Sequence, residues 1–226
     1  HIADQAMSER GLEPQFSQAV LQDLAKITGP AVDTDSRIRD LRTLLWCSID
    51  NDDSLDLDQL TASEVMDSQR TKIFVAIADV DALVKKDSAI DQHASINTTA
   101  VYTSAKVFPM LPERLSNDLT SLNPQQERLA LVIEIVITVD GEIDQFSIYR
   151  ARVLNRAKLA YDAVSAWIEG LSELPHAAKM IVGMDMQLRT QDTVAQLLRQ
   201  RRHQQGALEF ETFQPRAVFS GEQVVD

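Results

Sequence analysis

Residues 129–154 carry the pattern that most constrains the fold of this chain. From residue 129 to residue 139 apolar side chains alternate, and those on one side of an extended backbone are Leu129, Leu131, Ile133, Ile135 and Ile137. This period of two predicts a β-strand. Asp140-Gly141 is a strong hairpin turn, because glycine accepts the positive φ that such turns require. With residues 143–154 as the returning strand, the sequence predicts an antiparallel sheet.

Helical patterns flank this hairpin, and short strands precede it. One helix is predicted from the spacing of Phe16, Val20, Leu24 and Ile27 and ends at Gly29-Pro30; others are predicted over residues 89–101, 158–169 and 176–204. The last is expected to face the core with Met180, Met184, Leu188, Ala195 and Leu198. Strands are predicted around Ile49, over residues 72–80 with both faces buried, and over residues 207–219. The fold class is therefore α+β, with a mixed, mainly antiparallel sheet packed with helices.

An acidic segment, residues 48–60, carries the clearest chemical signal. Its sequence is S-I-D-N-D-D-S-L-D-L-D-Q-L, and five aspartates fall within nine positions: Asp50, Asp52, Asp53, Asp56 and Asp58. Crowded carboxylates repel one another unless a cation neutralises them, and hard oxygen ligands suit Mg²⁺ or Mn²⁺. On an extended backbone Asp56 and Asp58 point the same way, and a loop between them and Asp50 would bring all three together.

Three other interpretations of the acidic segment stay open on spacing alone. It can be a solvated surface loop, an Asp-rich turn or helix cap, or a calcium loop of EF-hand type. The calcium loop is disfavoured because Leu55 stands where that motif requires glycine, and Thr61 stands where it requires glutamate.

Composition limits the function classes. The net charge of −12 argues against non-specific nucleic-acid binding over the whole surface, because phosphate affinity comes from lysine and arginine. No apolar run is long enough to span a bilayer, so no membrane partner is expected. Cys47 is the only cysteine, which predicts a small buried side chain, no disulfide-linked partner and a reducing, cytoplasmic location.

Several blocks of the chain resemble the ribonuclease II-type (RNB) family. In that family a strand ending in Ile-Asp is followed by further aspartates, and the matching positions here are Asp50, Asp56, Asp58 and Gln59, with glutamine replacing the last aspartate. The form D-L-D-Q resembles a variant from a bacterial branch of the family. Further blocks are similar in the same order: residues 75–80 (V-A-I-A-D-V), 101–112 (V-Y-T-S-A-K-V-F-P-M-L-P), 115–124 (L-S-N-D-L-T-S-L-N-P), 149–164 and 201–210. The resemblance predicts a partial RNB catalytic domain over residues 41–226, after an N-terminal helical segment and connection over residues 1–40.

The resemblance implies a Mg²⁺-dependent hydrolytic 3′→5′ exoribonuclease, with Mn²⁺ as a possible substitute, that acts on single-stranded RNA and releases nucleoside 5′-monophosphates. The implied catalytic residues are Asp58 and Asp56, and the implied metal ligands are Asp50, Asp56, Asp58 and Gln59. Tyr102 is expected to stack on a base near the scissile end. Arg150 and Arg152 share a strand face and are expected to contact phosphates, with a salt-bridged strand end as the equal alternative.

Two further functions stay in view. Gln59, together with the absence of the family's arginine-rich S-P-I-R-R-Y-type motif, favours as an alternative a catalytically weak or inactive RNA-binding protein of the same fold. Metal-dependent phosphate release would separate this alternative from the nuclease. An acidic interaction or calcium-binding module is the third class, and the hairpin, Tyr102 and the downstream blocks argue against it.

Overall fold

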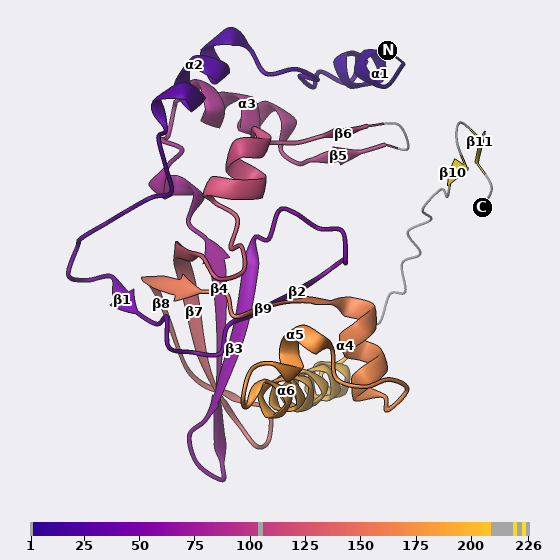
Figure 1. Ribbon diagram of the computed structural model, residues 1–226. Coiled ribbons are helices and arrows are strands. Elements are labelled where there is room, and N and C mark those ends of the chain that lie inside the picture. The colour runs from indigo at the N-terminus through magenta and orange to yellow at the C-terminus, as the bar shows by residue number, and fades with distance from the viewer. Residues whose placement is uncertain (1, 104–105, 209–218, 221–222, 225–226) are drawn as a thin grey trace.

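A seven-stranded mixed sheet forms the centre of the molecule. The computed structural model describes residues 2–103, 106–208, 219–220 and 223–224 (Figure 1). The sheet order is β1-β8-β7-β4-β3-β2-β9, and the strands are β1 Arg39–Asp40, β2 Cys47–Asp50, β3 Gln59–Val65, β4 Arg70–Ala78, β7 Glu127–Thr138, β8 Ile143–Leu154 and β9 Ala157–Ala160. Neighbours from β8 to β2 are antiparallel. At the two edges β1 runs parallel to β8, and β9 runs parallel to β2.

The predicted hairpin is present, with Gly141 at a φ of 74° between β7 and β8. The side of β7 that lines the main core differs from the one marked by the large alternating residues. Ala130 and Val132 are fully buried in the cluster around Trp46, together with Phe74 of β4. Leu131, on the opposite side, is 40% exposed. Both sides of β7 are apolar, so the alternation alone does not fix the direction of burial.

Strand β4 occupies the centre of the sheet, but the prediction that both of its faces are buried is wrong. Phe74 and Ala76 lie in the main core, whereas Ile77 on the other face is 41% exposed. The described helices cover that second face only in part. Helix α6 contacts it at the start of β4, where Thr71 and Val194 line a common hollow. Part of the sheet therefore presents half-buried apolar side chains to solvent.

Three helices pack beside β2 and β9, as Figure 1 shows: α4 Tyr161–Ile168, α5 His176–Lys179 and α6 Met184–Gln204. Cys47, Trp167, Met184 and Leu188 are buried in this second cluster. The single helix expected over residues 176–204 is two helices, because Gly183 adopts a φ of 85° before α6 begins. Met180 is consequently 71% exposed and lies outside the core.

A third cluster lies above the sheet in Figure 1. It joins α2 Gln18–Lys26, α3 Ala89–Asn97 and the π-helix Arg114–Leu119 through buried apolar side chains that include Val20, Ile90 and Leu115. The same region holds α1 Ile2–Glu9, the 3₁₀ turn Val80–Ala82 and the small hairpin of β5 Val101–Tyr102 and β6 Val107–Phe108.

The remaining predicted elements differ in their ends. The helix expected over residues 89–101 stops at Asn97, because Thr98 has a φ of 60°, and the helix expected from residue 158 begins only after strand β9. Of the strand expected over residues 207–219, residues 209–218 lie outside the described residues. Beyond them, β10 Phe219–Ser220 pairs with β11 Gln223–Val224. No helix in the described part of the chain is long and apolar enough to cross a membrane.

Candidate active site

The acidic loop, residues 50–58, begins where strand β2 ends. The Oδ1 atom of Asp50 accepts hydrogen bonds from the backbone N of Asn51 (2.7 Å) and from Oγ of Ser54 (3.0 Å). Lys158, on β9, donates from Nζ to the carbonyl oxygens of Asp52 (3.1 Å) and Ser54 (2.7 Å). The ammonium group of Lys158 therefore holds the turn that returns the chain toward Asp50, because it binds two backbone carbonyls of that turn.

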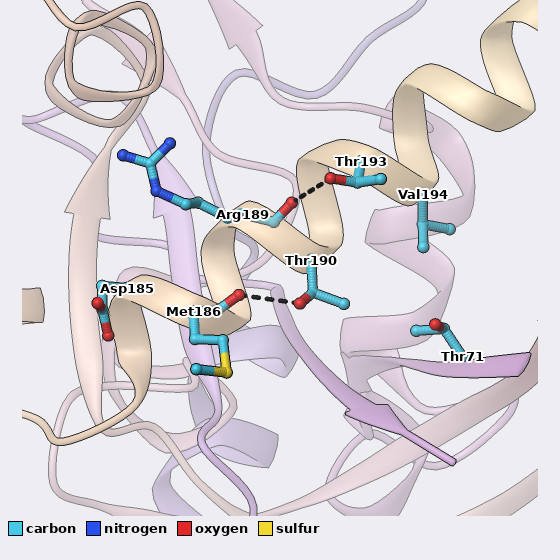
Figure 2. A pocket seen from close by; sticks show the side chains of 7 residues that line it. All are labelled: Thr71, Asp185, Met186, Arg189, Thr190, Thr193 and Val194. Carbon is cyan, nitrogen blue, oxygen red and sulfur yellow. Dashed lines mark hydrogen bonds between the residues drawn. The ribbon is translucent and has the colours of Figure 1, made fainter. Parts of the chain in front are cut away.

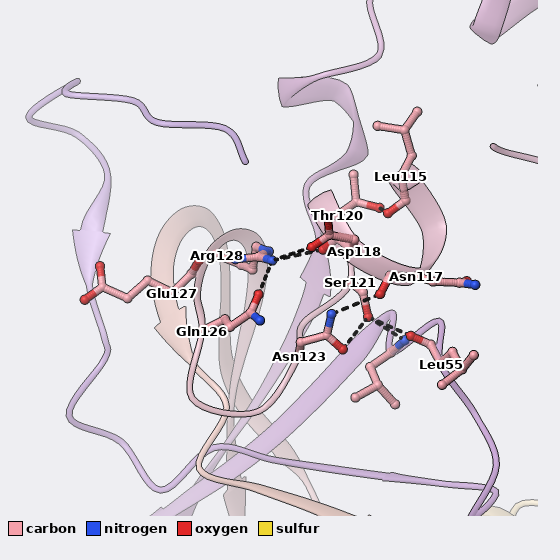
Figure 3. Close-up of polar contacts among 11 residues, drawn as sticks. Leu55, Leu115, Asn117, Asp118, Thr120, Ser121, Asn123, Gln126, Glu127 and Arg128 are labelled. Atoms are coloured by element: carbon pink, nitrogen blue, oxygen red, sulfur yellow. Dashed lines mark hydrogen bonds and ion pairs between the residues drawn. The ribbon is translucent and has the colours of Figure 1, made fainter. Parts of the chain in front are cut away.

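Leu57 anchors the second half of the loop. Its side chain is 2% exposed, its N–H donates to Oγ of Ser121 (3.0 Å), and its carbonyl accepts from the N–H of Leu122 (2.8 Å). The same Ser121 hydroxyl donates to the carbonyl of Leu55 at 3.0 Å, as Figure 3 shows. Because alternate residues of an extended segment face opposite sides, this anchoring leaves the exposed side chains of Asp56 and Asp58 on the solvent side.

The segment behind Leu57 is itself held by a polar network (Figure 3). Asn123 donates from Nδ2 to the carbonyl of Asn117 at 3.0 Å. Arg128, only 8% exposed, donates to the carbonyl of Asp118 at 2.9 Å and also binds Oε1 of Gln126. These hydrogen bonds hold the backbone behind the acidic loop in one arrangement, although the buried Nε of Arg128 has no hydrogen-bond partner among the described residues.

The charges of the three aspartates at the family-motif positions act on one another and on Tyr102. Partial burial raises the pKa of the Asp58 carboxyl, and the negative charges of Asp50 and Asp56 raise it further. Burial also raises the pKa of the Tyr102 hydroxyl, followed by the charge of Asp56, a hydrogen bond with that carboxylate, and the charges of Asp50 and Asp58. Tyr102, on the hairpin β5–β6, is 69% exposed and lies within reach of the charges of the acidic loop.

The donor set suits a hard cation, although the carboxylates are not gathered around one point. Within the described residues no group of three or more His, Cys, Asp or Glu side chains has a geometry that could hold a metal ion. Oxygen ligands of Asp50, Asp56 and Asp58 are nonetheless the kind that Mg²⁺ takes in small number. A bound cation would also offset the mutual repulsion that raises the pKa of Asp58.

Gln59 and Arg150 lie in one row across four strands. The register pairs Gln59 with Ile77, Ile77 with Leu131, and Leu131 with Arg150. At the usual strand spacing the two polar residues are about 15 Å apart. They therefore share one face of the sheet, with two half-exposed apolar residues between them.

The two predicted phosphate ligands differ in their surroundings. Arg150 forms ion pairs with Asp79 (Nε–Oδ2, 2.8 Å) and with Asp81 (Nη2–Oδ2, 2.9 Å). Arg152 pairs in register with Asp40 of β1. Hydrogen bonds from Arg42 chiefly lower the pKa of that carboxyl, and the charge of Arg152 lowers it further. Both arginines thus lie beside acidic groups of the chain itself, and their contact with phosphate stays a prediction.

Sequence reasoning missed the residues that support the loop. Lys158 was not among the predicted site residues, yet its Nζ atom binds two carbonyls of the loop. Ser48 and Asn155 are both buried, and Nδ2 of Asn155 donates to Oγ of Ser48 (3.1 Å) and to the carbonyl of Leu122 (2.8 Å). Polar residues at strand ends are common, so nothing in their local sequence distinguished these.

Two adjoining hollows lie elsewhere, between α6 and the sheet, and Figure 2 shows one of them. One has a volume of about 370 Å³ and is lined by Thr71, Asp185, Met186, Arg189, Thr190, Thr193 and Val194. Thr71 lies at the start of β4, whereas the N–H of Ala78 at its other end binds the carbonyl of Asp58 at 2.9 Å. The strand length places these hollows about 20 Å from the acidic loop, so they are separate from it.

The fold and the acidic loop agree with one protein class. The model of the RNB domain family matches residues 38–226, and the chain belongs to this family.

Individual relatives are ribonucleases R. The chain is 37% identical over 187 residues to ribonuclease R of Vibrio parahaemolyticus, and 32% identical to that of Escherichia coli. These matches cover 83% of this chain but only 22% and 23% of the relatives. Mycoplasma genitalium RNase R in complex with double-stranded RNA superposes with a TM-score of 0.83 at 27% identity, over 95% of this chain and 37% of that chain. Another structure is of the same RNase R in complex with ribose-methylated single-stranded RNA.

Proposed function

We propose that the protein is a Mg²⁺-dependent hydrolytic 3′→5′ exoribonuclease that shortens single-stranded RNA and releases nucleoside 5′-monophosphates. The observation that carries the proposal is the acidic loop in a chain of the RNB family: Asp50 lies at the end of β2, and Asp56 and Asp58 are exposed on the solvent side of the loop. The ribonuclease R relatives support the same reaction class. The single cysteine favours a cytoplasmic location.

The acidic residues would hold the cation. Asp50, Asp56 and Asp58 are the proposed carboxylate ligands, and Gln59 offers a neutral carbonyl oxygen or a hydrogen bond to a bound water. Mg²⁺, or Mn²⁺ in its place, would neutralise phosphate charge and activate water for phosphodiester hydrolysis. Asp56 and Asp58 are the proposed catalytic residues because both are exposed on the open side of the loop.

The other proposed roles concern the RNA strand. Tyr102 presents an exposed ring beside the carboxylates, so a terminal base stacked on it would place its phosphate near the acidic loop. Arg150 and Arg152 would contact phosphates from the same strand face. For Arg150 this contact requires phosphate to compete with Asp79 and Asp81.

The test is a cleavage assay with the product of the complete gene. We expect single-stranded RNA labelled at its 5′ end to shorten from the 3′ end with Mg²⁺ and to stay intact with EDTA. Asp58→Asn should abolish shortening, whereas Asp52→Asn, in the same exposed loop but outside the family motif, should preserve it. RNA that is retained by the protein but never cleaved would favour the non-catalytic RNA-binding alternative, which the replacement of aspartate by Gln59 supports.

A further inference from the structure

A buried polar cluster fastens the N-terminal segment to helix α3. His93 and Asn97, in the last two turns of α3, are 3% and 2% exposed. Both contact Glu13, in the connection between α1 and α2. Glu13 precedes the residues that match the RNB family, so the contact joins a segment outside that match to a helix within it.

Each polar atom of the cluster has a complementary partner. The Oδ1 atom of Asn97 accepts from the N–H of Glu13 (2.8 Å), and Nδ2 donates to the carbonyl of Glu13 (2.9 Å). Nδ1 of His93 lies 2.8 Å from Oε2 of Glu13, and Nε2 lies 3.1 Å from Nδ2 of Asn97. All contacts are satisfied when His93 carries its proton on Nδ1 and accepts from Asn97 through Nε2. Loss of one partner would leave a buried polar group unpaired, which is costly.

Two further contacts from the N-terminal segment reach the same region. Oδ2 of Asp23, on α2, accepts from the N–H of Ala89 at 3.0 Å, at the first residue of α3. Lys106, on the loop of the small hairpin, lies 3.6 Å from Oδ1 of Asp4 on α1. Residues 4–23 therefore hold α3 at both ends and also contact the hairpin that follows it, and Figure 1 shows these elements grouped above the sheet.

The cluster lies close to Tyr102 along the chain. Helix α3 ends at Asn97, Thr98 turns the backbone with a φ of 60°, and β5 begins at Val101. Only residues 98–100 lie between the end of α3 and the start of β5, so we expect a shift in the last turn of α3 to move Tyr102 as well. We infer that Glu13, His93 and Asn97 are positioning residues that hold Tyr102 against the acidic loop, so that the N-terminal segment determines how the 3′ end of RNA is seated. This inference rests on the proposed role of Tyr102.

The decisive experiment is a double-mutant cycle on RNA affinity. The complete gene product is titrated into fluorescein-labelled oligoadenylate in EDTA, so that the RNA stays intact. The Kd is then measured by fluorescence anisotropy. Tyr102→Ala should raise the Kd about fivefold or more, the range for a lost stacked base. Asn97→Asp keeps the side-chain shape but replaces the Nδ2 donor with an acceptor, and should raise the Kd about threefold or more. Because both act through one ring, the double variant should bind no more weakly than Tyr102→Ala.

A second variant series covers the case in which Asn97→Asp does not fold. The Glu13 side chain is 45% exposed, so Glu13→Ala removes the partner of His93 without opening a buried cavity. It should weaken binding in the same direction, and Glu13→Gln, which retains an oxygen acceptor for Nδ1, should restore it. Glu9→Ala, on α1 and without a described contact to α3, is the matched control and should bind like the unmodified protein.

The outcomes separate the inference from the function on which it rests. Weaker binding by Tyr102→Ala, with folded Asn97 and Glu13 variants that bind normally, would overturn the positioning role alone. Additive losses in the double variant would also overturn it, because the cluster would then act somewhere other than Tyr102. Unchanged binding by Tyr102→Ala would overturn the proposed role of that ring and the inference with it.

Discussion

Leu55 and Leu57 provide a direct test of how the acidic loop is oriented. Leu57 is 2% exposed and Leu55 is 62% exposed, although one residue separates them. Leu57→Ala removes three buried carbon groups and leaves a cavity, which together cost about 3 kcal/mol of unfolding free energy. Leu55→Ala should change that free energy by less than about 0.5 kcal/mol. For a chain of this size the Leu57 variant should melt about 6–12 °C lower.

Guanidinium unfolding followed by tryptophan fluorescence measures this difference. Trp46 and Trp167 are both buried, so their emission reports the loss of the folded core. The unfolding midpoint of Leu57→Ala should fall with an unchanged slope, since the variant alters stability and not the surface that unfolding exposes. Equal losses for Leu55→Ala and Leu57→Ala would refute the inward direction of Leu57, and with it the solvent side assigned to Asp56 and Asp58.

Three other perturbations test separate features of the structure. Lys158→Met should speed amide hydrogen exchange in residues 51–54, because two loop carbonyls lose their cation; unchanged exchange would show that the loop is held by other contacts. Burial raises the pKa of the Cys47 thiol from 9.0 to about 11, so the folded state keeps a proton that the unfolded state releases, and stability should decline as the pH rises from 9 toward 11. In unfolding titrations Cys47→Ala should lose about 2 kcal/mol less unfolding free energy than the unmodified protein between about pH 9 and pH 11. An identical pH profile for the two proteins would contradict the raised thiol pKa. Gly141→Ala should cost about 1–2 kcal/mol in denaturant unfolding, since Gly141 has a φ of +74° and a new Cβ would lie 3.1 Å from Leu197, whereas Gly29→Ala meets open space and should be nearly neutral.

Local sequence patterns predicted the hairpin because both strands and the turn lie within 26 consecutive residues, 129–154. They did not predict which face of β7 lines the main core. The small residues Ala130 and Val132 pack tightly beneath Trp46, whereas the larger Leu131 stays half-exposed. Side-chain size therefore does not indicate which face is buried, because burial depends on what the other elements place above each face.

The candidate site was also predicted only in part, because its proposed ligands were nominated from the sequence and its supporting residues were not. Asp50, Asp56, Asp58 and Tyr102 were nominated from sequence blocks that resemble the RNB family. In the structure burial and the charges of the aspartates raise the pKa of Asp58 and of Tyr102, and the roles of these residues stay predictions. The supports of the loop, above all Lys158 and Ser121, act through backbone atoms far away in the chain. Since any residue carries a backbone carbonyl and N–H, such contacts leave no residue-type signature to read in advance.

The parallel edges of the sheet set an order for folding during synthesis. Strand β1 pairs with β8 and β2 pairs with β9, and more than a hundred residues separate the partners in each case. The β7–β8 hairpin can form as soon as its own residues leave the ribosome, because its contacts are local. Strand β2, which ends at Asp50, gains its parallel neighbour only after Ala160 has been made. The carboxylate-bearing loop therefore lacks its parallel neighbour until β9 has been made, and a nascent chain stalled before β9 would display the loop without the contacts of Lys158.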